Sequence, residues 1–486
     1  MQRRWLGWSC LACSVTLYGC AVGPDYHRPT IETPVTYRFA DVQAMQQSSA
    51  EWWSQFNDPV LDALIQKAIA QNKDLAVAAA RIDEYYGRLM TTRSALYPQL
   101  SAGLSGGRER QPATPLTREY ETTEVQAGVM ASWEIDLFGR LRRLRESARA
   151  DLLGTKYARD ATLISLEASV ATAYISLRDL DQRLVIAHST VDSRAGALKL
   201  YKERFQGGVV SQVQVSQADS EYAIALASEY DFEQQIAQQE NALSLLLGEN
   251  PGPIPRGKPI DQLTVPSIPA GLPSSLLDQR PDIREAEQTL VSANAQIGAA
   301  RAQYFPTISL TGLFGAASTA LSSLWSGPAK MWSYAGAANV PIFTAGGIAG
   351  TVKQAEARQQ EALFTYQSTI QNAFADVEDA LVGEQRTKDQ LGAVDRQVRA
   401  LGQYASLARE LNEGGYTSYL EVLDAERSLF NAQLSQSGLQ GQRLIQVVNV
   451  YKALGYGWPR DGSPMASNAT PERTTPANGL ASPEQK

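Results

Sequence analysis

The sequence predicts an α+β membrane protein in which a few short strands are continued by very long helices. Three features predict this fold class: a lipoprotein-type N-terminus, paired segments in which apolar and polar residues alternate, and two proline-free spans with heptad periodicity. The chain of 486 residues has a formal charge of −7, and this acidic balance argues against a nucleic-acid partner. No apolar run reaches the length of a spanning helix, so membrane contact must come from strands or from an anchor.

Residues 1–19 have the organisation of a secretory signal peptide. Two arginines precede an apolar stretch, and Leu17-Tyr18-Gly19-Cys20 has the form of a bacterial lipobox. We therefore expect cleavage before Cys20 and acylation there, because two or more acyl chains anchor a protein stably. Tyr18 is bulkier than usual at such a site, so an ordinary signal peptide with a chance cysteine is the alternative.

Proline positions divide the mature chain. Prolines cluster within 251–280 and after Trp458, whereas 117–250 and 342–458 contain none. Since proline disrupts helices, long helices belong in the proline-free spans. The expected organisation is a lipidated N-terminal segment and equatorial region at 20–60, a first structural repeat at 61–250, a Pro-rich linker at 251–280, a second structural repeat at 281–458 and a disordered tail at 459–486.

The two repeats follow one plan. Residues 74–98 match 282–306 at an offset of 208, and Gly207-Gly208 matches Gly414-Gly415 at an offset of 207. A nearly constant offset over this length indicates an internal duplication.

Each repeat begins with a helix of about 23 residues that ends before an aromatic-Pro pair, after which the period changes to two. Four strands with one apolar and one polar face are expected at 99–106, 125–136, 307–314 and 332–340, with loops at 108–119 and 317–330.

Strands of this length suit an outer-membrane barrel. Four strands cannot close a barrel, and an open sheet in lipid leaves backbone groups unpaired, so closure needs several chains. A soluble sheet packed on helices is the alternative.

Each second strand is followed by an unusually long helix. Residues 140–206 carry an a/d heptad seam that the second repeat keeps 207 residues later. A helix of 67 residues spans about 100 Å, so it reaches far from the strands. Glycine pairs at 207–208 and 414–415 end the two helices, and Ser211 and Ser418 are placed to cap the returning ones.

Four motifs are specific in combination. They are Cys20-Ala21-Val22-Gly23-Pro24-Asp25-Tyr26, Gln279-Arg280-Pro281-Asp282-Ile283, Tyr419-Leu420-Glu421-Val422-Leu423-Asp424-Ala425-Glu426-Arg427-Ser428-Leu429 and Tyr451-Lys452-Ala453-Leu454-Gly455-Tyr456-Gly457-Trp458. Together they resemble the outer-membrane efflux proteins of the TolC and OprM type, in the lipoprotein branch often called NodT-like. The resemblance covers nearly the whole mature chain.

This resemblance implies a homotrimer, in which four strands per chain make a 12-stranded barrel in the outer membrane and the helices make a periplasmic coiled-coil tunnel. Drugs or other small molecules would pass through passively once a periplasmic membrane-fusion adaptor and an inner-membrane RND-type pump dock. It implies no enzyme activity and no cofactor beyond the lipid on Cys20. A type I protein secretion or metal efflux duct and a structural coiled-coil lipoprotein are the alternatives.

The resemblance places a periplasmic aperture at Leu420, Asp424 and Arg427, with Glu421 where some relatives have a second aspartate. Glu421 and Asp424 lie three residues apart on one helix face, so three chains would bring up to six carboxylates around one axis and attract cations. A solvated helix face is the alternative.

The hairpin tips are expected to contact the adaptor, although simple turns would have the same sequence. The residues concerned are Gly207, Gly208, Val209, Ser211, Gly414, Gly415, Tyr416 and Thr417. We expect no catalytic constellation and no metal site, because the two histidines, His27 and His188, have no ligand spacing in the sequence.

Overall fold

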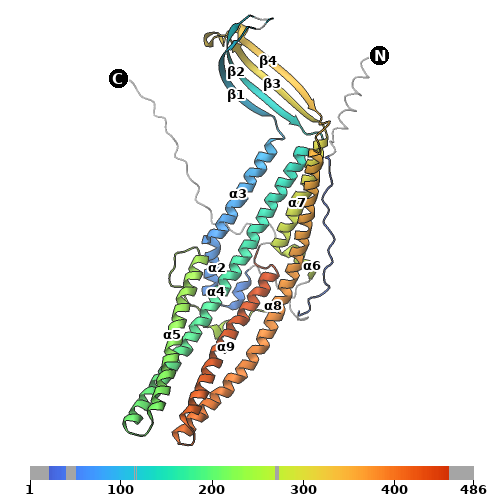
Figure 1. Ribbon diagram of the computed structural model, residues 1–486. Helices are drawn as coiled ribbons and strands as arrows, with labels where there is room; N and C mark the ends of the chain where they lie inside the picture. Colours follow the sequence, from blue (N-terminus) through green and yellow to red (C-terminus); the bar gives the residue numbers. More distant parts are fainter. Residues whose placement is uncertain (1–20, 40–50, 114, 116–117, 269–272, 459–486) are drawn as a thin grey trace, which may run out of the picture.

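The computed structural model describes residues 21–39, 51–113, 115, 118–268 and 273–458. Long helices form a rod with a four-stranded sheet at one end and two hairpin tips at the other (Figure 1). The predicted signal peptide, Cys20 and the predicted C-terminal tail lie outside the described residues. The main elements are η1 (Trp52–Phe56), α2 (Pro59–Gln71), α3 (Lys73–Ser94), β1 (Gln99–Gln111), β2 (Tyr120–Ile135), α4 (Arg140–Gln206), α5 (Gln212–Leu246), α6 (Pro273–Gln279), α7 (Pro281–Arg301), β3 (Thr307–Ser318), β4 (Lys330–Asn339), α8 (Gly347–Glu413) and α9 (Tyr419–Ala453).

The internal duplication is visible in the helix lengths. Helices α4 and α8 both have 67 residues, and α5 and α9 both have 35. A glycine with positive φ precedes each long helix, at Gly139 (φ 81°) and Gly346 (φ 86°). The predicted long helix at 140–206 is therefore confirmed, and the heptad seam explains it, since Leu163, Val170 and Leu177 are fully buried.

The sheet is antiparallel in the order β1-β2-β3-β4, which leaves β1 and β4 as its two edges. The first pair of strands is longer than predicted, because 108–111 belong to β1 rather than to a loop. Ion pairs across the strands explain the difference: Arg108 contacts Glu121, and Arg110 contacts Glu119 and Glu121. Charged residues at the strand ends were taken for a polar loop, although they alternate and pair as strand residues do.

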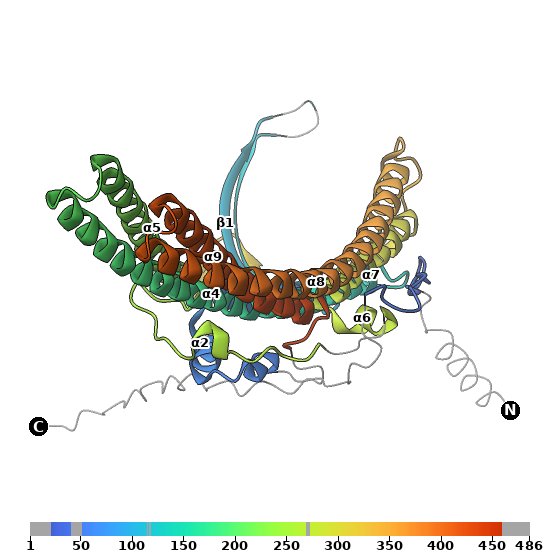
Figure 2. The same ribbon diagram turned by 90° about the horizontal axis from the view of Figure 1, so that it is seen from below.

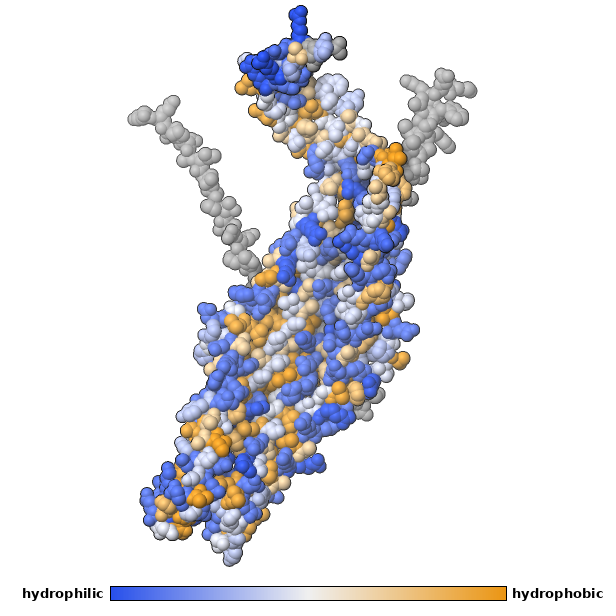
Figure 3. All heavy atoms as spheres, viewed as in Figure 1, coloured by the Kyte–Doolittle hydropathy of each residue, from blue (hydrophilic) through white to orange (hydrophobic). Residues whose placement is uncertain are grey.

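The sheet stands apart from the helices, and most of its residues are exposed (Figure 1). This arrangement rules out the alternative of a soluble sheet packed on helices. One face carries large exposed apolar side chains, and Figure 3 shows hydrophobic surface over the strands; the residues are Leu100, Leu104, Val129, Phe314, Trp332 and Tyr334. None of the helices in the described segments is both long and apolar enough to cross a membrane.

A small equatorial core lies on the convex side of the curved helix layer, where α2 and α6 pack (Figure 2). Trp52 of η1 stacks on Tyr451 of α9, with ring centroids 5.2 Å apart. Asp58, which is completely buried, caps α2 and accepts a hydrogen bond of 2.7 Å from the Tyr174 hydroxyl. The predicted linker also contains a helix, α6, whose first residue is Pro273, because proline fits the first helical turn.

The N-terminal segment 21–39 is fastened to the top of the helices. The Val22 amide donates to the Phe138 carbonyl at 3.0 Å, directly after β2. Arg143, whose side chain is only 6% exposed, pairs with Asp25 at 2.8 Å. Gly23 has a φ of 103°, and a Cβ there would lie 2.3 Å from the Cα of Gly298, so only glycine fits this contact. The start of the mature chain is thereby held at the junction of strands and helices.

Candidate channel aperture at the helix tips

Each long helix ends in a glycine pair whose second member is left-handed. Gly208 and Gly415 have φ of 73° and 74°. The Val209 amide donates to the Arg204 carbonyl at 2.9 Å, and the Tyr416 amide donates to the Leu411 carbonyl at 2.8 Å. These bonds satisfy carbonyls that the helix ends would otherwise leave free. Val209 and Tyr416 project from the two tips, with 75% and 85% of their surface exposed.

The returning helices begin at Ser211 and Ser418, as the sequence predicts. The Ser211 amide donates to the side-chain oxygen of Gln214 at 2.9 Å. The Ser418 hydroxyl makes no capping bond, which differs from the expectation. The neighbouring Thr417 hydroxyl instead donates to the Glu421 carboxylate. Glu421 is therefore tied to the tip of its own hairpin.

The four predicted aperture residues lie together. Leu420, Glu421, Asp424 and Arg427 line a groove of about 640 Å³ between α5 and α9. The Asp424 and Arg427 side chains are 53% and 58% exposed and form an ion pair of 3.0 Å within α9. In a single chain this pair joins residues of one helix, whereas the sequence analysis considered a pair between neighbours. Tyr404 of α8 also lines the groove and was not predicted.

A buried arginine near the tips was missed by the sequence analysis. The Arg194 side chain in α4 is 5% exposed and forms an ion pair of 2.5 Å with Glu221 in α5. Its guanidinium also lies 5.7 Å from the Phe430 ring centroid in α9. Arg194 falls at a d position of the heptad seam, seven residues after Ala187, and a charge at a seam position is the signal that could have revealed it.

Aromatic contacts also join the two hairpins. The rings of Tyr201 in α4 and Tyr419 in α9 lie 3.9 Å apart between centroids, and the Tyr201 hydroxyl lies 3.4 Å from Asn412 of α8. Burial raises the pKa of Tyr419 above its ordinary range, so this phenol stays neutral. The Arg409–Glu426 pair, at 2.5 Å, then ties α8 to α9. The candidate aperture therefore lies on a hairpin that is fastened to its neighbour.

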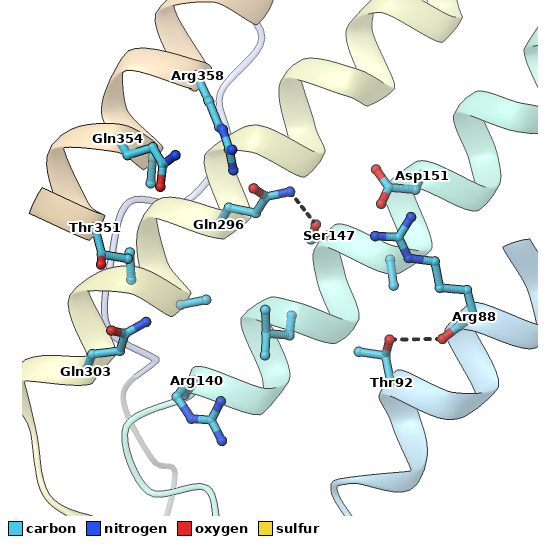
Figure 4. A pocket seen from close by; sticks show the side chains of 15 residues that line it. Arg88, Thr92, Arg140, Ser147, Asp151, Gln296, Gln303, Thr351, Gln354 and Arg358 are labelled. Carbon is cyan, nitrogen blue, oxygen red and sulfur yellow. Dashed lines mark hydrogen bonds between the residues drawn. The ribbon is translucent and has the colours of Figure 1, made fainter. Parts of the chain in front are cut away.

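A second pocket lies at the opposite end of the helices, next to the sheet (Figure 4). Its volume is about 420 Å³, and Arg88 of α3, Arg140 of α4 and Arg358 of α8 line it. Arg140 makes two hydrogen bonds of 2.8 Å to the Glu134 carboxylate at the end of β2. This arginine thus joins the strand to the helix, and the pocket gives the junction a polar, mainly positive surface.

The comparisons with known proteins agree with this geometry. The model of the outer membrane efflux protein family matches residues 64–249 and 272–456, which is more than half of the chain. The chain belongs to the outer membrane efflux protein family. The predicted resemblance is therefore confirmed.

Relatives of this family member cover nearly its whole length. The cation efflux system protein CusC of Escherichia coli O6:H1 is 37% identical over 459 residues, covering 92% of this chain and 98% of the relative. The probable efflux pump outer membrane protein TtgC of Pseudomonas putida is also 37% identical, covering 93% and 96%.

Solved structures of the family share the fold. The outer-membrane channel OprN superposes with a TM-score of 0.83 at 28% identity, covering 90% of this chain and all of that one. A CusC structure superposes with a TM-score of 0.81 at 35% identity. The predicted outer-membrane channel fold, with four strands per chain and long helices in the periplasm, is confirmed, and so is its role as an efflux component.

Proposed function

We propose that three copies of this efflux protein form one duct, with a 12-stranded barrel in the outer membrane and a tunnel of helices in the periplasm. The observation that carries the proposal is the open sheet. Its edge strands β1 and β4 have no partner within the described chain. An open sheet in lipid would leave these backbone groups without hydrogen bonds, at several kcal/mol each. Pairing β4 of one copy with β1 of the next removes both edges.

The duplication also gives the register of that pairing. Within the chain, Ala131 of β2 lies opposite Gly312 of β3. The ladders relate β1 to β3 by 208 residues and β2 to β4 by 207, since Gln99 pairs with Ser132 and Thr307 with Asn339. If the contact between copies repeats the contact between β2 and β3, Ala338 lies opposite Leu104 of the neighbouring copy. Both residues belong to the apolar face.

Cysteine cross-linking tests this register. The Leu104→Cys/Ala338→Cys variant should form covalent trimers on mild oxidation, because directly opposed Cα atoms are within disulfide reach. The matched control, Ala102→Cys/Ala338→Cys, displaces one cysteine by two residues on the same face, where roughly 7–8 Å separates the positions. Nonreducing electrophoresis after purification measures both. Equal cross-linking of the two variants, or none in either, would contradict the proposed contact.

In this proposal the duct performs no chemistry, and solutes move passively through it. A periplasmic adaptor would dock at the exposed tips, from Gly207 to Ser211 and from Gly414 to Thr417, and connect the duct to an RND-type pump in the inner membrane. The position of the tips, at the end opposite the sheet, supports this arrangement. The relatives CusC and TtgC are equally similar to this chain, so similarity does not choose between a cation and an organic substrate.

We also propose that Cys20 carries the lipid anchor. Val22, two residues later, is bonded to Phe138 where β2 meets α4, so acyl chains on Cys20 would enter the membrane beside the barrel. The Cys20→Ser variant should lose acylation completely, because no other thiol remains after signal removal. Metabolic labelling with a radioactive fatty acid measures this loss, and persistent label in the variant would refute the assignment.

A further inference from the structure

A histidine and two carboxylates meet midway along the first hairpin. His188 belongs to α4, and Glu229 and Glu233 belong to α5. One ligand atom from each lies within 4.8 Å of the other two. The sequence analysis expected no metal site, because no ligand accompanies His188 in its own segment; the hairpin brings both glutamates to it from the facing helix.

The backbone that carries these side chains is packed firmly. Ala187, next to His188, is fully buried, and Phe232, next to Glu233, packs with it and with Phe430 in one cluster. Glu229 and Glu233 are one helical turn apart and so share a face of α5. The three groups are therefore directed to one place by two helices whose separation is fixed by apolar contacts.

The spacing of two of the groups already fits coordination. The His188 Nδ1 atom lies 3.2 Å from Oε1 of Glu229. Nitrogen and oxygen ligands about 2.0–2.2 Å from a tetrahedral Zn²⁺ are separated by about 3.3 Å. The third group, Glu233, is exposed to solvent, so rotation of its side chain can bring a carboxylate oxygen to the same distance.

Glu229 provides an independent observation. Its side chain is only 13% exposed, and its second oxygen, Oε2, is buried and accepts no hydrogen bond from the described residues. Buried carboxylate oxygens normally have a partner, because desolvation without one is unfavourable. A bound cation would supply the missing interaction, whereas His188, with 52% of its side chain exposed, leaves a path from solvent.

We propose that His188, Glu229 and Glu233 bind one divalent transition cation of the Zn²⁺ type, with water in the remaining position. An imidazole with two carboxylates suits such an ion, while Mg²⁺ and Ca²⁺ prefer sites made entirely of oxygen ligands. The ion connects α4 to α5 far from both the aperture and the sheet. It therefore joins the two arms of the first hairpin and stabilises the folded chain on binding.

Calorimetric titration of Zn²⁺ into the full mature protein, purified in detergent without a histidine tag, tests the proposal. We expect one ion per chain with a dissociation constant on the order of 10 µM. The His188→Gln and Glu233→Gln variants should each bind at least about tenfold more weakly. Both residues are exposed, so these variants should fold. His27→Gln, which changes the only other histidine, is the matched control and should bind as the wild type does.

A thermal measurement adds a second readout. Zn²⁺ should raise the unfolding temperature of the wild type and of His27→Gln but not that of His188→Gln, and millimolar Mg²⁺ should not displace it. Absence of saturable binding in the wild type would overturn the site. Binding that survives unchanged in His188→Gln, or is lost equally in His27→Gln, would also overturn it.

Discussion

Replacing Glu421 and Asp424 together with alanine is expected to raise the single-channel conductance of the resting duct by about twofold or more and to weaken its block by multivalent cations. Both side chains line the groove beside α5, and with three copies they place up to six carboxylates around the axis. Truncation to alanine widens the narrow region and removes the groups that hold cations there. Because Arg427 then loses its partner Asp424, the selectivity should also move toward anions.

Planar-bilayer recording of conductance, reversal potential and cation block measures these changes. The matched control is Glu413→Ala, which removes an exposed carboxylate at the end of α8 that does not line the groove. We expect the control to conduct as the wild type does. A Glu421→Ala/Asp424→Ala channel with unchanged conductance and selectivity would contradict the placement of the aperture at these residues.

The Glu167→Gln variant is expected to be more stable than the wild type, and increasingly so as the pH rises from about 5 to about 9. Glu167 lies in α4 within the equatorial core and is completely buried. Burial raises the pKa of its carboxyl group to about 9, and the neighbouring Trp52 side chain opposes the shift only in part.

The sign follows from proton linkage. A raised pKa means that the folded chain keeps the proton over a range in which the unfolded chain has released it. The contribution of Glu167 to the free energy of unfolding is therefore fully present below its ordinary pKa of 4.5 and is lost as the pH rises toward 9. The slope in this window is at most about 1.4 kcal/mol per pH unit. Glutamine keeps the shape of the protonated acid but does not titrate.

Thermal unfolding followed by tryptophan fluorescence at pH 5.5 and pH 8.5 measures the effect. The unfolding temperature of the wild type should fall more between the two conditions than that of Glu167→Gln. Glu361→Gln, an exposed position on α8, is the control and should behave as the wild type does. Parallel curves for the wild type and Glu167→Gln would show that this carboxyl group does not titrate as proposed.

The long elements could be predicted from the sequence because their signals are local and repeated. Heptad spacing marks α4 over its whole length, and the glycine pairs at 207–208 and 414–415 mark both tips. Alternation marks the strands on their apolar faces. The duplication strengthens each of these predictions, since every signal occurs twice.

Other features depend on contacts between distant segments and could not be predicted in this way. Arg108 and Arg110 extend β1 because their partners lie on the neighbouring strand. Arg194 becomes a buried link only where α4 packs on α5 and α9. The approach of His188 to Glu229 likewise appears only once the hairpin is formed.

The most direct test of the duct is a recording of the purified wild-type protein in planar bilayers, with its mass in detergent measured on the same sample. A trimer that gives small, cation-selective currents is the result that three joined sheets and an acidic aperture predict. A monomer that gives no currents would contradict the account, since a single four-stranded sheet cannot enclose a pore.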